Sequence, residues 1–113
     1  MAKNTLKFSI VELLVLSLLS KKDLYGYEIV SLISRISNGV FSISEGTLYP
    51  TLYKMEDANF ITYKEKLVNK RRKRNYYHLE EKGKQKLDED LKEFRMMTSA
   101  IQEILNCDEL PEQ

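Results

Sequence analysis

The chain is poor in the residues that carry most metal and catalytic chemistry. It has one cysteine, Cys107, and one histidine, His78, in 113 residues. A single cysteine excludes an intramolecular disulfide and predicts a free thiol without a role. One cysteine and one histidine cannot supply the ligands of a usual zinc site. A nucleophile-base arrangement would have to use His78, which lies in a strand-like pattern. Phosphate-binding glycine motifs are also lacking, so we predict no enzyme activity and no cofactor.

Long apolar runs and low-complexity segments are lacking too. The densest apolar run, Phe8 to Leu19, carries Glu12 and is too short to cross a bilayer. It does not follow the pattern of a signal peptide. With 4 glycines, 2 prolines and 42% hydrophobic residues, the composition disfavours disorder and fibrous repeats. We therefore expect a cytoplasmic protein with one modest core and no membrane partner.

Charge is distributed unevenly, although the net charge is only +1. Residues 1–79 hold 13 basic and 7 acidic side chains, whereas residues 80–113 hold 5 and 10. Five cations are consecutive from Lys70 to Arg74, where they repel one another and stabilise no fold. Such a run indicates a polyanionic partner, of which a nucleic-acid duplex is the commonest. The plainer interpretation, a solvated turn that aids solubility, stays open.

Apolar periodicity predicts three helices in the first half of the chain. Residues 6–19 are apolar almost all round and predict a buried helix, and a second helix is expected over 24–36. The β-branched stretch 40–43 predicts a small strand. A third helix is expected over 44–58, with Ser44 as its N-cap. Its proline, Pro50, predicts an irregular or 3₁₀-like first turn.

The second half predicts two strands and a long helix. Residues 60–68 and 74–79 alternate as antiparallel strands joined near Asn69, and a helix follows over 81–106. Apolar positions on that helix recur at heptad spacing and predict a dimer seam. The seam comprises Leu87, Leu91, Phe94, Thr98, Ile101 and Leu105. We expect part of the helix to pack on its own body and the rest on a partner.

These elements predict a mainly α fold with a small β-hairpin. Residues 1–80 would form a winged helix-turn-helix domain, 81–108 a dimerisation helix and 109–113 a frayed tail. A winged helix places one helix in the major groove of DNA and its basic hairpin on the flanking backbone. The expected DNA contacts are therefore polar or basic residues of the second and third helices and of the hairpin. They are Tyr25, Tyr27, Ser44, Thr47, Tyr49, Lys54, Lys70, Arg71, Arg72, Lys73 and Arg74.

Three motifs in order resemble the PadR family of bacterial transcriptional regulators, in its smaller subfamily. They are Tyr25-Gly26-Tyr27-Glu28-Ile29, the Gly-Thr-Leu-Tyr-Pro block within 44–56, and a basic residue, Tyr-Tyr-x-Leu and glycine over 74–83. Glu80 stands where the family usually has threonine, and Asn59 where it has glycine. The resemblance implies a homodimeric repressor on a palindromic operator in double-stranded DNA. It also implies relief by a small aromatic or cytotoxic effector, for which the candidate pocket is Phe8, Phe94, Met96 and Met97.

Several alternatives stay open at this stage. Tyr49 is either a DNA contact or a half-buried core aromatic, and one of Tyr25 and Tyr27 is expected to touch phosphate while the other packs. The aromatic and methionine cluster around Phe94 is more often plain core than a ligand pocket. At the level of function, the alternatives are a winged-helix module that binds protein or structured RNA, and a small-molecule sensor with weak DNA affinity.

Overall fold

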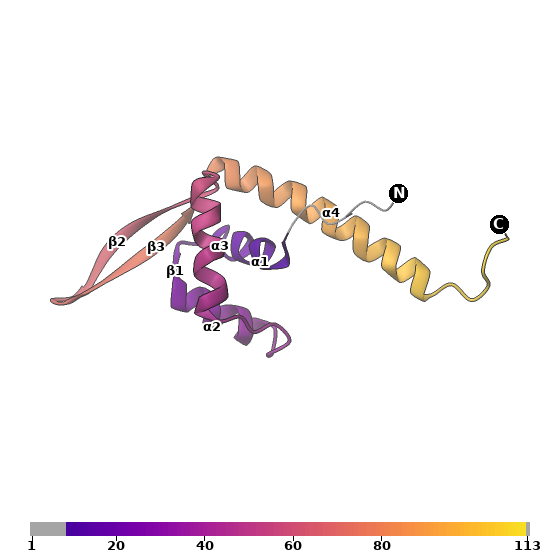
Figure 1. The fold of residues 1–113 in the computed structure, drawn as a ribbon, viewed down its shortest axis with the longest axis horizontal. Helices are drawn as coiled ribbons and strands as arrows, with labels where there is room; N and C mark the ends of the chain where they lie inside the picture. Colours follow the sequence, from indigo (N-terminus) through magenta and orange to yellow (C-terminus); the bar gives the residue numbers. More distant parts are fainter. Residues whose placement is uncertain (1–8, 113) are drawn as a thin grey trace.

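The computed structural model describes residues 9–112 and confirms a mainly α fold with a β-hairpin. A helical body carries two projections that leave it in opposite directions, the hairpin and the C-terminal helix (Figure 1). The molecule is correspondingly elongated, with extents of 69 × 29 × 24 Å. The elements in chain order are α1 (Ile10–Leu19), β1 (Leu24–Tyr25), α2 (Gly26–Ile36), α3 (Glu45–Asp57), β2 (Ile61–Asn69), β3 (Arg72–Leu79) and α4 (Glu81–Leu105).

The first two helices begin later than the sequence predicts. The Ser9 side chain accepts a hydrogen bond from the Glu12 N–H, so α1 begins at Ile10 and not at residue 6. Leu24 and Tyr25 were expected in the second helix, but they form a short strand that pairs with β3. The Glu28 carboxylate accepts from the Tyr25 N–H at 3.2 Å, which satisfies a donor at the start of α2.

The predicted strand at residues 40–43 is wrong. Asn38 and Gly39 adopt positive φ angles of 52° and 79° just after the end of α2. Beyond them, the Phe41 N–H donates to the Ser37 side chain at 3.0 Å, so this hydrogen-bonded loop turns back on the end of α2. In the part of the chain that the structure describes, the sheet contains only β1, β3 and β2. A short β-branched run does not form a strand where no strand edge lies beside it.

Helix α3 follows its sequence signals closely. The Ser44 side chain accepts from the Thr47 N–H at 3.2 Å, and Asn59 closes the exit with a φ of 65°. The predicted irregular first turn is wrong, because the helix is α-helical from Glu45 through Pro50 to Asp57.

The sheet joins the hairpin to the body. Its strand order is β1-β3-β2, all antiparallel, and Ile61 lies opposite Leu79 as Tyr63 lies opposite Tyr77. Both predicted strands are confirmed. Strand β3 begins two residues earlier than expected, at Arg72, so most of the basic run belongs to a strand and not to a turn.

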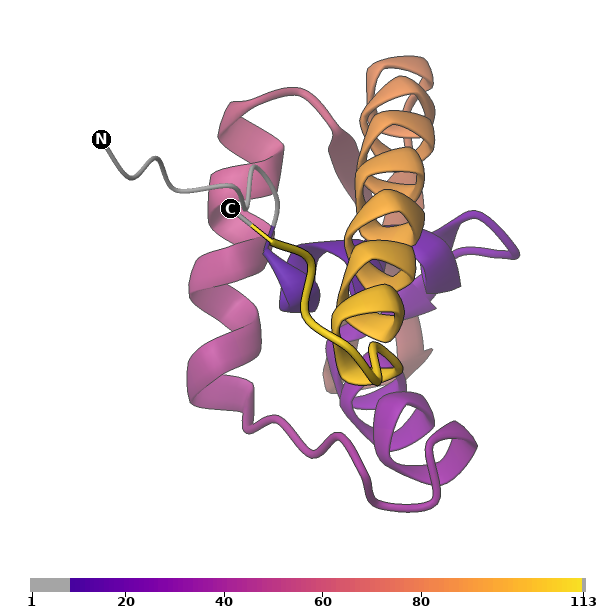
Figure 2. The ribbon, with the colours of Figure 1, turned by 90° about the vertical axis from the view of Figure 1, so that its right-hand side faces the viewer.

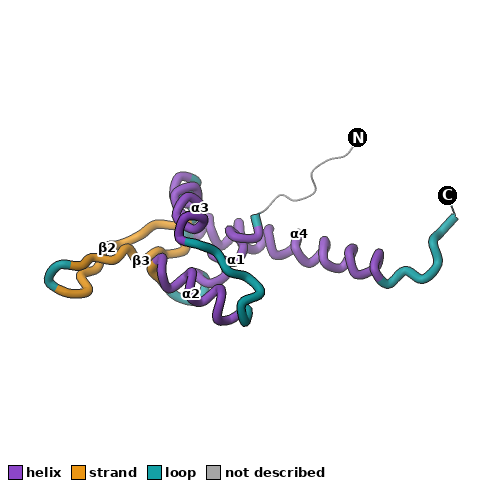
Figure 3. Tube along the Cα trace, turned by 60° about the horizontal axis from the view of Figure 1, so that its bottom comes forward, coloured by secondary structure: helices purple, strands orange, loops and turns teal. Residues whose placement is uncertain are grey.

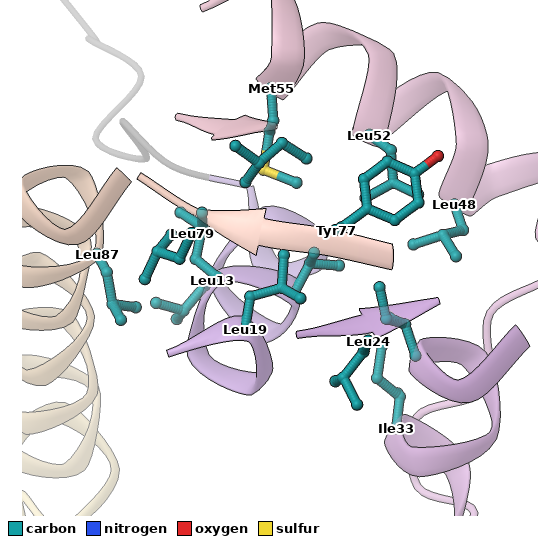
Figure 4. Packing of buried hydrophobic residues seen from close by; sticks show 14 residues of the cluster. Leu13, Leu19, Leu24, Ile33, Leu48, Leu52, Met55, Tyr77, Leu79 and Leu87 are labelled. Atoms are coloured by element: carbon teal, nitrogen blue, oxygen red, sulfur yellow. The ribbon is translucent and has the colours of Figure 1, made fainter. Parts of the chain in front are cut away.

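One apolar core connects the helices to the root of the sheet (Figure 4). Leu48, Leu52 and Met55 of α3 pack against it, together with Tyr77 of β3. Helix α4 passes beside the body and ends well beyond it (Figures 1 and 2). Its Leu87 is only 7% exposed and belongs to this core. Leu87 is therefore not available to a partner in this conformation, which corrects its place in the predicted seam.

Candidate nucleic-acid interface

A groove of about 630 Å³ lies where the hairpin meets the body. The start of α2, the first turns of α3 and strand β3 form its walls, and Figure 3 shows the hairpin leaving the body between these two helices. The N-terminus of α2, the polar side chains of α3 and the basic strand β3 therefore face the same space. Its lining residues are Tyr25, Gly26, Tyr27, Glu45, Tyr49, Glu65, Arg72, Lys73, Arg74 and Asn75.

The basic side of the groove is an open strand edge. Strand β1 covers β3 only at Tyr76 and Tyr77, so residues 72–75 have no strand on that side within the described chain. Arg72, Lys73 and Arg74 follow one another along this edge, and Lys70 and Arg71 form the turn beyond it. The cations thus reach from the body to the hairpin tip, which suits a charged polymer that extends past the groove.

Tyr49 holds α3 against the start of α2. Gly26 is buried, and a Cβ added there would overlap the Tyr49 hydroxyl and lie 2.8 Å from its Cζ. Burial raises the pKa of Tyr49 above its usual value of 10.0, and the Glu45 carboxylate and Tyr53 add to the shift. A tyrosine phenol is protonated at neutral pH even at its usual pKa, so Tyr49 can donate a hydrogen bond to an anion. Tyr49 is half-buried and lines the groove at the same time, so the two interpretations of the sequence are not exclusive.

The two tyrosines at the start of α2 have different surroundings. Tyr25 is half-buried, and its ring meets the Tyr76 ring edge-on at a centroid distance of 5.4 Å. The Arg74 guanidinium carbon lies 4.2 Å from the Tyr25 centroid. Tyr27 lines the same groove and is 62% exposed. This division matches the expectation that one tyrosine packs and the other is free to bind.

The remaining candidates on α3 lie at its two ends. Ser44 and Thr47 are exposed near the groove, although the Ser44 hydroxyl already caps the helix and lies 3.3 Å from the Thr47 hydroxyl. Lys54 does not line the groove. Its ammonium lies 3.2 Å from the Glu12 carboxylate, so it ties the last turn of α3 to α1. Lys54 therefore contacts the body, although its side chain is 75% exposed, and its DNA contact stays a prediction.

Sequence reasoning missed the acidic and amide side chains of the groove. Glu45 is not among the predicted contacts, but it lines the groove at the start of α3. Glu65 and Asn75 lie directly opposite each other in the β2–β3 register and both line it as well. Strand alternation could have placed Glu65 and Asn75 on one face once the register was known.

The distal part of α4 is exposed and apolar. Ile101, Ile104 and Leu105 are 45%, 76% and 70% exposed. The candidate effector residues are only partly brought together: Phe94 and Met97 lie against the core, whereas Met96 is 73% exposed. Phe8 lies outside the described residues. Within them, no group of three or more metal-ligating side chains occurs, and none of the helices is long and apolar enough to cross a membrane.

Four helices and a three-stranded sheet, two of whose strands form a projecting basic hairpin, define a winged-helix protein. Residues 15–89 match the model of the transcriptional regulator PadR-like family, and the chain belongs to this family. It is 31% identical over 91 residues to the transcriptional regulator YqjI of Escherichia coli, which covers 80% of this chain and 42% of that protein. The chain thus spans less than half the length of that curated relative.

Solved structures show the same fold. A PadR family transcription regulator from Clostridium difficile superimposes with a TM-score of 0.75 at 32% identity, covering 87% of this chain and all of that one. Bacillus subtilis PadR in complex with operator DNA superimposes with a TM-score of 0.69 at 26% identity, covering 93% of this chain and 52% of that one. The family resemblance predicted from the three motifs is confirmed.

Proposed function

We propose that this protein is a homodimeric, sequence-specific repressor that binds a palindromic operator in double-stranded DNA. The observation that best supports the proposal is the groove, because it brings the starts of α2 and α3 to the basic edge of β3. A duplex offers both partners that such a groove needs: phosphates for the helix start and cations, and base edges for polar side chains on α3.

The two sides of the groove would divide the work of binding. Thr47 and Tyr49 on α3 reach toward base edges or phosphates in the major groove, with Ser44 holding the helix start. Arg72, Lys73 and Arg74 neutralise phosphates along β3, while the turn at 70–71 extends the contact to the next stretch of backbone. This division gives affinity to the hairpin and selectivity to α3.

Glu45 gives this groove a further means of selection. Carboxylates and phosphates repel each other, so Glu45 and Glu65 disfavour any binding orientation that places DNA phosphates beside them. At the start of α3, Glu45 lies where a recognition helix meets base edges, and a carboxylate accepts a hydrogen bond from the N4 amine of cytosine. We therefore place Glu45 among the residues that select the operator sequence.

The distal half of α4 would join two copies. Ile101 and Leu105 lie on one helical face and expose apolar surface that a second α4 would cover. A twofold dimer presents two α3 helices, which meet successive major grooves when they lie about 34 Å apart. A flat aromatic effector would bind beside Phe94 and Met97 and relieve repression by favouring a dimer with a different spacing.

Selection from a pool of random duplexes tests this function. Repeated binding and amplification should enrich an inverted repeat whose half-sites are one helical turn apart, and the protein should sediment as a dimer. Enrichment of no sequence would contradict the proposal. If structured RNA or a protein displaced every duplex at equal ionic strength, the winged-helix interaction module would be the better account.

A further inference from the structure

Four side chains from three strands form one row across the root of the hairpin. The Lys66 ammonium lies 4.8 Å from the centroid of the Tyr76 ring, and the Arg74 guanidinium lies 4.2 Å from that of Tyr25. The two rings meet edge-on between them, at 5.4 Å and an interplanar angle of 69°. The register explains the row, because Lys66 lies opposite Arg74 and Tyr25 opposite Tyr76.

Stacking restrains Arg74 without using up its hydrogen-bond donors. A guanidinium is flat, so it can lie on a ring while the N–H groups at its rim stay available to a phosphate. The ring of Tyr25 is itself fixed, since Tyr25 is half-buried, paired to β3 and bonded through its N–H to Glu28. The side chains of Arg72 and Lys73 are exposed and make no hydrogen bond, ion pair or ring contact within the described residues. Arg74 is therefore the cation that the groove holds in place.

We infer that Tyr25 is a positioning residue for DNA binding, which acts by holding Arg74 against the start of α2, where a backbone phosphate binds. This inference rests on the proposed function. It replaces the expectation that a tyrosine hydroxyl at this position touches phosphate. The Tyr76 ring meets the Tyr25 ring edge-on, and the Lys66 ammonium lies against the Tyr76 ring. Removing the Tyr25 ring then weakens binding only while Arg74 is present.

A double-mutant cycle on a selected operator tests the coupling. Tyr25→Phe keeps the ring and should bind within about twofold of wild type, whereas Tyr25→Leu should bind roughly fivefold more weakly. Arg74→Ala should weaken binding and lower the salt slope by about 0.9. Adding Tyr25→Leu to Arg74→Ala should change the affinity by less than about twofold. Tyr63→Leu, which removes a ring from the opposite face of the same sheet, serves as the control.

Proton NMR of the free protein tests the stacking without DNA. The side-chain protons of Arg74 should be shifted upfield by the Tyr25 ring, stay shifted in Tyr25→Phe and Tyr63→Leu, and lose the shift in Tyr25→Leu. Thermal unfolding of each variant separates a loss of position from a loss of fold.

Three results would overturn the inference. They are a loss of affinity in Tyr25→Phe equal to that in Tyr25→Leu, additive effects in the cycle, and an unchanged Arg74 spectrum in Tyr25→Leu. If the wild-type protein bound no duplex selectively, the proposed function would fail and the role of Arg74 with it. A selective wild type with an additive cycle would sink this inference alone.

Discussion

The hairpin and the distal half of α4 both leave the body, but their exposed surfaces are opposite in character. From residue 64 to 74 the hairpin carries seven cations and one acid, Glu65. After Arg95, α4 and the tail carry four acids and no cation, and their exposed side chains include Ile101, Ile104 and Leu105. Both projections are exposed to solvent, but their different side chains indicate two kinds of partner. The hairpin suits a polyanion, and the helix suits an apolar surface of protein.

Both projections have their roots in the same core. Tyr77 is 2% exposed at the root of β3, and Leu87 is 7% exposed near the root of α4. Strand β3 and α4 follow each other directly, separated by Glu80, whose carboxylate accepts from the Thr62 hydroxyl at 2.7 Å. A change at either root can therefore reach both projections, whereas a change at either tip should reach only one.

Charge placed on the distal face of α4 should have the largest effect. Ile101→Glu with Leu105→Glu should convert the dimer to a monomer, because two carboxylates would face their copies across the seam. Operator affinity should fall on the order of 100-fold, since two linked half-sites bind more tightly than one. Ser99→Glu with Ala100→Glu adds the same charge to exposed positions away from the seam and should leave the dimer intact. A double variant that still sedimented as a dimer would place the seam elsewhere.

Neutralising the edge of β3 should affect DNA binding alone. Arg72→Ala, Lys73→Ala and Arg74→Ala together should weaken operator binding tens of fold at moderate salt. The salt slope should fall by about 0.9 for each phosphate that is no longer neutralised. Sedimentation should still show a dimer. The matched control removes three exposed lysines outside the groove, Lys21→Ala, Lys84→Ala and Lys92→Ala. An equal loss from this control would show that net charge, and not the groove, governs binding.

The root of α4 should be sensitive to a single methyl group. A Cβ at Gly83 would overlap the Phe60 carbonyl oxygen and lie 2.6 Å from Leu79 Cδ1, so backbone must move to admit it. We expect Gly83→Ala to lower the free energy of unfolding by about 1–3 kcal/mol. Gly46→Ala is the control, because its Cβ would lie 3.6 Å from the nearest atom, Ser44 Oγ. Urea unfolding measures both, and equal stabilities would show that α4 is not seated as described.

Burial of Tyr77 at the root of the hairpin should make the free energy of unfolding depend on pH in alkaline solution. Burial raises the pKa of Tyr77 to about 12, with a smaller contribution from Glu56. The unfolded chain ionises this phenol near pH 10, so its contribution is fully present below pH 10 and is lost as the pH rises toward 12. The difference is on the order of 2 kcal/mol. The free energy of unfolding, measured with urea across this pH range, should fall less steeply for Tyr77→Phe than for wild type. Parallel curves for the two proteins would contradict the burial of Tyr77.

The sequence predicted the parts of this fold that local signals determine. Ser44 and Asn59 mark the ends of the third helix, and the alternation of Tyr77 and Leu79 marks a strand of the hairpin. The apolar heptad spacing after residue 81 predicts the long helix. The stretch at 40–43 has the right residues for a strand, yet no sheet edge lies beside it. Leu24 and Tyr25 became a strand because β3 offers them an edge, which no local pattern reveals.

The same limit applies to the candidate site. The cations of the hairpin and the polar start of α3 were visible in the sequence, because charge runs and helix caps are local. The contact of Lys54 with Glu12 joins positions 42 residues apart, and Glu45 and Glu65 line one groove although they belong to different elements. The stacking of Arg74 on Tyr25 likewise depends on the pairing of β1 with β3.

Binding of the purified protein to the DNA upstream of its own gene, against a scrambled duplex and across a salt series, tests the central claim most directly. A homodimeric repressor with this groove should prefer one duplex, show a steep salt slope, and lose affinity in Arg72→Ala and Tyr49→Ala. Should the upstream region lack an operator, a duplex selected from the random pool takes its place. A folded dimer that bound no duplex even at low salt would contradict the account.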